Sequence, residues 1–284
     1  MTPAAPWPSE PDRLVTSDDG TAIALFRSGT VGRPPLVLVH GAAADHTTFR
    51  VLGPLLAEDH DLFAIDRRGR GASGDTMPYA IEREFEDVAA VAVAVVQTTG
   101  HAQVDVFGHS YGGRCALGAA LTSPIVGRVV SYEGAPTPPG ERYGDAALAD
   151  ELASLATAGE NESILERFMT EVVGMSATDL GRYRADAVWP RRVAAAPTIA
   201  RELRVEAGAE AGLERLGRVQ VPVLQLLGSD SLPAFASATH ALDRRLADGH
   251  VVVIEGARHA AHHTHPEAVV AALRAFLPEE RSPV

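Results

Sequence analysis

Short, almost uninterrupted apolar runs recur along the first half of the chain, each ending in a turn of glycine or charged residues. Pro35–Gly41, Asp61–Asp66 and Gly127–Tyr132 are clear examples. A strand that is buried on both faces of a parallel sheet has this pattern, because neither face meets water. Stretches with helical spacing, such as Phe49–Ala57 and Phe85–Thr98, lie between the runs. The alternation predicts an α/β fold with a doubly wound, mostly parallel sheet.

The alternation stops after Gly134 and resumes at Val221. In between, the helical periods are broken by glycine and proline, and no stretch has the pattern of a strand. We therefore predict a sheet domain made of residues 1–134 and 219–284, with residues 135–218 inserted as a helical cap.

The sharpest predicted turn is Gly108-His109-Ser110-Tyr111-Gly112-Gly113. A β-rich run precedes it and a helical stretch of small apolar residues follows, which is the context of a G-x-S-x-G nucleophile elbow. The strained turn needs positions 108 and 112 nearly free of side chains, so that strand and helix can approach. Ser110 is therefore the candidate nucleophile. The alternative is a glycine-rich turn that happens to contain a serine.

Composition narrows the chemistry and the partners. All 25 basic residues among the 284 are arginine, which excludes a Ser-Lys dyad, a pyridoxal Schiff base and a P-loop lysine. A net charge of −12 argues against nucleic acid or an anionic membrane surface as partner. The single cysteine, Cys115, excludes an intrachain disulfide framework, and we expect it to pack as a small apolar side chain.

The ends of the chain and its apolar runs bear on location. The proline-rich arm at residues 1–12 lacks the basic start and apolar core of a signal peptide, and no apolar run is long enough to span a membrane. We therefore expect a cytoplasmic protein. We also expect a small-molecule substrate and no cofactor, and a homodimer stays open.

Four motifs follow one another along nearly the whole chain. They are Val39-His40-Gly41-Ala42 followed by Phe49, the loop Asp66–Ser73, the elbow at Ser110, and Glu255–His259 followed by His265-Pro266-Glu267. In this order they resemble the motifs of the α/β-hydrolase superfamily, and the elbow and the last motif are the specific ones. The resemblance implies an oxyanion hole made by the backbone N–H groups of Ala42 and Tyr111. We also expect Gly41 to contact the substrate.

A serine hydroxyl needs an imidazole within reach as its base. His259 is the predicted base, because it follows a strand at the sheet edge where ligands bind in such folds. His40 and His109 lie in motif turns, where a structural hydrogen bond is the expected role. Three further histidines follow His259 closely: His262, His263 and His265. Together they could suggest a metal site, but Glu267 is the only carboxylate with them, so no metal is predicted.

The acid of the triad departs from the common family pattern. Most relatives carry an Asp at the position of Ser231, and the nearest carboxylate here, Asp230, is one residue early. A minority of the superfamily, including some haloalkane dehalogenases and zearalenone-type lactonases, place the acid directly after the strand that follows the elbow, which here is Glu133. Either carboxylate would fix the imidazole tautomer. We favour Glu133 and keep Asp230 as the alternative.

The cap is expected to shape a mainly apolar pocket. We expect its bulky residues to pack within the helices, with Trp189 as the strongest candidate for contact with substrate; the others are Phe168, Met169, Met175 and Tyr183. The resemblance also implies that epoxide hydrolases and dehalogenases of this fold use an Asp as the elbow nucleophile. A serine at the elbow therefore argues against both activities.

These features predict a serine hydrolase that cleaves a carboxylic ester or lactone of a small, largely apolar molecule through an acyl-serine. Two alternatives stay open: a carbon–carbon bond (diketone) hydrolase with the same triad, and a non-catalytic small-molecule receptor of the same fold.

Overall fold

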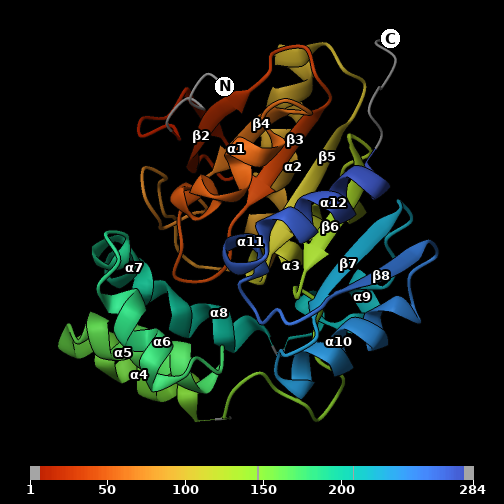
Figure 1. Ribbon diagram of the computed structural model, residues 1–284. Coiled ribbons are helices and arrows are strands. Elements are labelled where there is room, and N and C mark those ends of the chain that lie inside the picture. The colour runs from red at the N-terminus through yellow and green to blue at the C-terminus, as the bar shows by residue number, and fades with distance from the viewer. Residues whose placement is uncertain (1–6, 146, 207, 278–284) are drawn as a thin grey trace.

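The computed structural model describes residues 7–145, 147–206 and 208–277, which form an eight-stranded sheet covered by helices, with further helices beside it (Figure 1). The strand order is β1-β2-β4-β3-β5-β6-β7-β8. The pairs β1–β2 and β2–β4 are antiparallel, and every later pair is parallel. The strands are β1 (Arg13–Thr16), β2 (Ala22–Gly29), β3 (Pro35–Val39), β4 (Asp61–Ile65), β5 (Val104–His109), β6 (Val126–Tyr132), β7 (Val223–Gly228) and β8 (Gly249–Ile254). This is the predicted mostly parallel sheet.

The sheet is buried on both faces, which explains the continuous apolar runs: every residue of β3 and β4 is buried. One face packs against α2 (Ile81–Thr99), α3 (Tyr111–Thr122), α9 (Leu213–Leu216) and α10 (Pro233–Asp243). The other packs against η1 (His46–Arg50), α1 (Leu52–Leu56), α11 (Ala261–Thr264) and α12 (Pro266–Phe276). No helix within the described ranges is long and apolar enough to cross a bilayer.

Two helices differ from the predicted bounds. The stretch predicted as one helix over 49–57 is the 3-10 turn η1 followed by the short α1, because Asp45 caps η1 through the Thr47 N–H and Gly53-Pro54 favours a helix poorly. Helix α2 begins earlier than residue 85, because Ile81 is also buried on its inner face.

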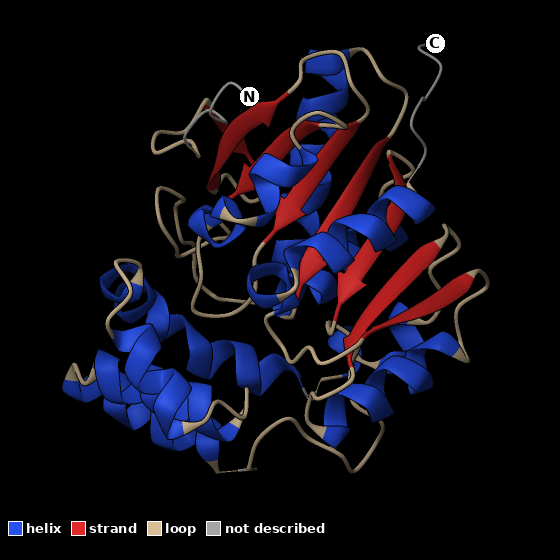
Figure 2. Ribbon diagram, viewed as in Figure 1, coloured by secondary structure: helices blue, strands red, loops and turns tan. Residues whose placement is uncertain are grey.

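The described residues between β6 and β7 form helices and turns without a strand, as predicted for a cap. Figure 2 shows most of these helices grouped beside the carboxyl ends of the parallel strands, and most of them share an apolar cluster, which Ala43 of the sheet domain joins. They are α4 (Leu148–Ala158), α5 (Asn161–Glu171), α6 (Ala177–Arg184), α7 (Trp189–Ala195), η2 (Ala196–Thr198), α8 (Ile199–Glu206) and η3 (Ala209–Ala211). Helix α9, which falls inside the predicted 135–218 insertion, packs on the sheet through Leu213 and Leu216. The exact division of the chain stays a prediction.

Candidate active site

Ser110 lies in the turn between β5 and α3, with φ 54° and ψ −125°. The positions two residues before and after it must be glycine for steric reasons. A Cβ on Gly108 would lie 2.4 Å from the carbonyl oxygen of Gly112, and one on Gly112 would lie 2.3 Å from that of Val39. Strand and helix can therefore approach only because these positions have no side chain, as the sequence argument required.

Three non-glycine residues of the described chain have a left-handed φ: Ala43 at 49°, Ser110 at 54° and Glu133 at 50°. They follow the carboxyl ends of β3, β5 and β6, which are adjacent strands in the order β3-β5-β6. Residues with a side chain rarely adopt this backbone conformation, and such strained residues cluster at functional sites. The strained residues thus mark one edge of the sheet as the candidate site.

Glu133 and His259 meet at this edge. His259 Nδ1 lies 2.6 Å from Glu133 Oε2, and both residues are buried. Because a carboxylate can only accept, Nδ1 carries the proton and the opposite ring nitrogen, Nε2, has the free lone pair. The hydrogen bond therefore selects the tautomer that can act as a base toward a hydroxyl.

The loop that carries His259 is fastened by residues of the two central strands. His109 Nε2 donates to the His259 carbonyl oxygen at 2.7 Å, and the Tyr132 hydroxyl donates to the Arg258 carbonyl oxygen. Burial lowers the pKa of His109 well below its usual value, so it is a neutral structural donor. The ring of Phe235 stacks on His259 with centroids 4.4 Å apart. These contacts hold the imidazole beside the elbow.

Glu133 is anchored through its second oxygen. Oε1 accepts from the Gly228 N–H at 2.8 Å and from the Ser231 hydroxyl at 2.5 Å. Asp230, the alternative acid, is exposed; its carboxylate accepts from the Ser229 hydroxyl at 3.0 Å. The structure brings Glu133 to the imidazole and leaves Asp230 at the surface.

A cavity of about 390 Å³ opens from Ser110 and His259 toward the cap. Four cap side chains line it and also pack in the apolar cluster of the cap, as expected: Phe168, Met169, Met175 and Tyr183. On its other side Ser110 borders a smaller recess of about 30 Å³, which Tyr111, Arg114, Glu202 and Glu206 also line. The larger cavity falls within the range of about 300–1,000 Å³ that is typical of ligand pockets.

Two sequence-predicted substrate contacts, Trp189 and Gly41, are not among the described residues that line either cavity. Trp189 packs in the apolar cluster of the cap, where its ring meets Tyr183 edge-on and its Nε1 donates to Glu162 Oε1 at 3.0 Å. The indole N–H thus has its partner inside the cap, and the expected contact with substrate has no support from the cavity lining. Gly41 is buried against the elbow, where a Cβ would lie 3.0 Å from that of Ser110. It permits close packing of two loops.

Ala42 and Tyr111 both border the cleft beside Ser110. Tyr111 is the first residue of α3, and N–H groups in the first turn of a helix have no acceptor within the helix. Ala42 precedes the strained Ala43. Their backbone N–H groups are therefore candidates for stabilising negative charge at a substrate oxygen.

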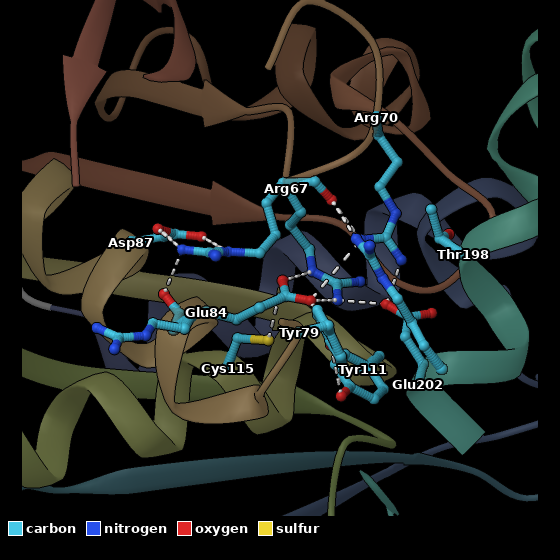
Figure 3. Close-up of polar contacts among 12 residues, drawn as sticks. Arg67, Arg70, Tyr79, Glu84, Asp87, Tyr111, Cys115, Thr198 and Glu202 are labelled. Atoms are coloured by element: carbon cyan, nitrogen blue, oxygen red, sulfur yellow. Dashed lines mark hydrogen bonds and ion pairs between the residues drawn. The ribbon is translucent and has the colours of Figure 1, made fainter. Parts of the chain in front are cut away.

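A buried charge network supports Tyr111 and ties the cap to the sheet domain (Figure 3). Arg67 donates to both oxygens of Glu84 in α2, at 2.7 and 2.6 Å, and also to Glu202 in α8. Arg70 donates to Glu202 as well. The Arg67 guanidinium lies 4.5 Å from the centre of the Tyr111 ring. The Tyr79 hydroxyl lies 2.9 Å from the Tyr111 hydroxyl and donates to Glu84 at 2.7 Å. Sequence reasoning assigned no role to these charges.

The other histidines of the motifs have structural contacts, either a hydrogen bond to a backbone group or packing of one ring on another. The Arg67 N–H donates to His40 Nε2 at 3.0 Å, and burial together with Arg67 lowers the pKa of His40 well below its usual value. His262 and His263 pack with ring centroids 4.2 Å apart, and both rings lie near the Thr48 hydroxyl. Among the described residues, no three His, Cys, Asp or Glu side chains are arranged to hold a metal ion.

Comparison with known proteins identifies the family. The model of the alpha/beta hydrolase family matches residues 36–272. The chain therefore belongs to this family, whose members are hydrolases.

Solved structures have the same fold. An alpha/beta hydrolase from Sphaerobacter thermophilus DSM 20745 is similar with a TM-score of 0.78 and 30% identity, covering 93% of this chain and 99% of that one. The enol-lactonase from Burkholderia xenovorans LB400 has a TM-score of 0.76 at 19% identity, covering 93% and 98%. The esterase RhEst1 from Rhodococcus sp. ECU1013 has a TM-score of 0.68 at 24% identity, covering 93% and 97%. The last two likenesses show the fold alone.

A curated relative matches over a shorter stretch. The uncharacterized hydrolase YugF from Bacillus subtilis (strain 168) is 29% identical over 106 residues, which cover 37% of this chain and 38% of that protein. The match thus spans less than half the length of that relative. The narrower resemblance to zearalenone-type lactonases is not confirmed by these relatives.

Proposed function

We propose that the chain is a serine hydrolase that cleaves a carboxylic ester or lactone of a small, largely apolar molecule. The observation that carries the proposal is the 2.6 Å hydrogen bond from His259 to Glu133, in a cleft that His259 and Ser110 both line. The esterase and the enol-lactonase of the same fold support the choice of bond.

In the first half-reaction, Ser110 Oγ attacks the carbonyl carbon while His259 Nε2 takes its proton. Glu133 stabilises the imidazolium without becoming protonated. The oxygen of the tetrahedral intermediate accepts from the N–H groups of Ala42 and Tyr111, and each such donor is typically worth about 2.7–4 kcal/mol of barrier. His259 then protonates the leaving oxygen, the carbon–oxygen bond breaks and an acyl-serine is left.

In the second half-reaction, His259 takes a proton from water, whose oxygen attacks the acyl carbon. Collapse of the intermediate returns the proton to Ser110 Oγ and releases the carboxylic acid. With a lactone, the leaving oxygen stays attached to the acyl chain, so one hydroxy acid is released.

The test is Ser110→Ala, assayed beside the wild type on short 4-nitrophenyl esters. We expect kcat to fall by at least about 10³-fold, and a fluorophosphonate probe to label the wild type only. Ser154→Ala, an exposed serine of α4, is the matched control and should keep both activity and labelling. Retained ester hydrolysis in Ser110→Ala would refute the proposal.

A substrate panel separates the alternatives. Esters, lactones and a vinylogous diketone are compared on the wild type, and turnover of the diketone alone would favour carbon–carbon bond hydrolysis. Tight ligand binding without labelling of Ser110 would favour a receptor.

A further inference from the structure

The wall of the larger cavity carries a buried cation that the proposed steps do not use. Arg192 of α7 lines this cavity together with Ser110 and His259, and only 2% of its surface is exposed. A guanidinium keeps its charge in proteins. The substrate cavity therefore has a fixed positive charge in one wall.

The contacts of Arg192 leave part of its charge uncompensated. Nη1 donates to Asp45 Oδ1 at 3.1 Å, and Nε donates to the Tyr183 hydroxyl at 3.1 Å. Asp45 lies outside the cavity lining and also pairs with Arg191, at 3.5 Å. Two arginines thus share one carboxylate, and the group as a whole is positive.

The surroundings of Arg192 add to this positive field. Arg50 lines the same cavity and pairs with Asp186 at 3.2 Å. Burial, together with Arg50 and Arg192, lowers the pKa of His263 to about 4, so His263 is neutral at pH 7. Much of the remaining wall is apolar, including Met169 and Met175. The cavity therefore combines apolar surface with one cationic region.

The other buried cation beside Ser110 does not suit a substrate group. Arg114 borders the recess of about 30 Å³ and pairs with Glu206 at 2.9 Å. That recess has room for water only, and the charge of Arg114 already has its own carboxylate.

We propose that the substrate bears a carboxylate that Arg192 binds while the ester or lactone carbonyl lies at Ser110. This inference rests on the proposed function and specifies its substrate class. A planar guanidinium matches a carboxylate in shape and in hydrogen-bond geometry. A buried charge is costly unless it is paired. Arg192 shares Asp45 with Arg191, so an incoming carboxylate would complete the neutralisation of its charge. Binding at this distant group would also orient the carbonyl.

The test uses substrate pairs in which one member has a free carboxylate and the other has the same carboxyl group methylated. On the acyl side, mono-4-nitrophenyl adipate is compared with the same ester methylated at its far carboxyl. On the alcohol side, 4-carboxyphenyl butanoate is compared with its methyl ester at the carboxyl, with hydrolysis of the phenyl butanoate bond measured by chromatography. The quantity measured is the ratio of kcat/KM for the acid to that for its methylated partner.

We expect the wild type to prefer the acid in at least one pair, and Arg192→Gln to reduce that ratio by about 10- to 100-fold, as for the loss of a hydrogen bond to a charged group. Arg191→Gln is the matched control: it removes the same charge from the same helix and the same Asp45, but its residue lies outside the cavity lining. It should leave the ratio within about twofold of wild type. The double variant Asp45→Asn/Arg192→Gln leaves less uncompensated charge and serves if the single variant does not fold.

Fluorophosphonate labelling of Ser110 and hydrolysis of the neutral esters are followed in every variant. They report on the proposed hydrolase, whereas the ratio reports on Arg192. The inference is wrong if the wild type prefers neither acid, or if Arg191→Gln lowers the ratio as much as Arg192→Gln does.

Discussion

The Ser231 hydroxyl donates to Glu133 at 2.5 Å, while the other oxygen of that carboxylate accepts from His259 at 2.6 Å. Position 231 is where the family resemblance leads one to look for the acid. The loop after β7 therefore keeps its place beside the imidazole, but it contributes a donor to a carboxylate that comes from the end of β6.

Replacement of the acid tests this arrangement. Glu133→Gln keeps the size of the side chain but no longer fixes the productive tautomer, so we expect kcat on 4-nitrophenyl esters to fall by about 10⁴-fold. Asp230→Asn should change kcat by less than about twofold, because Asp230 is exposed and bonded to Ser229. If Asp230→Asn showed the larger loss, Asp230 would be the acid.

The docking of the cap can be tested at Glu202. Glu202→Gln removes the carboxylate that Arg67 and Arg70 share, and breaking a buried pair costs about 3–5 kcal/mol. We expect a loss of this order in the free energy of unfolding, measured with urea. The control Glu214→Gln should cost no more than about 1 kcal/mol, because the Glu214 side chain is 83% exposed. Equal effects of the two variants would mean that Glu202 does not anchor the cap.

Stability should depend on pH through His263. Its pKa is lowered from 6.5 to about 4, so between these values the unfolded chain binds more protons than the folded one. Stability therefore falls as the pH is lowered from about 6.5 toward 4 and is unaffected by this group above that window.

We expect His263→Gln to make the loss of urea stability between pH 7 and pH 5 shallower than in wild type. The control His250→Gln replaces an exposed histidine beside Asp248 and should reduce the slope by less. An unchanged slope in His263→Gln would contradict the assigned shift.

Cys115 should be unreactive in the folded protein. It is fully buried in α3, its sulfur lies 3.8 Å from Glu84 Oε2, and burial raises the pKa of the thiol well above its usual value. Because the thiolate is the reactive form, we expect a chromogenic disulfide reagent to label Cys115 at least about 100-fold more slowly than after unfolding. The thiol introduced by Ser154→Cys provides the exposed reference in the same chain. Equal labelling rates at both positions in the native state would show that α3 opens readily.

The amino-acid pattern predicts the layered sheet and the elbow, and the family resemblance adds the two acid candidates. These features are local: a strand buried on both faces needs a continuous apolar run, and the close approach behind Ser110 needs glycine at 108 and 112. The pattern also showed where the alternation of strands and helices is interrupted by the cap.

The contacts between distant side chains follow from the folded arrangement of the elements. Glu133 and His259 are 126 positions apart, and no local pattern could rank Glu133 against Asp230 by distance. Arg191 and Arg192 are adjacent and look alike in the sequence, yet the side chain of one is 48% exposed and that of the other 2%. The orientation of α7 on the sheet domain decides this, and it also turns Trp189 inward, because a short helix takes its buried face from what it packs against.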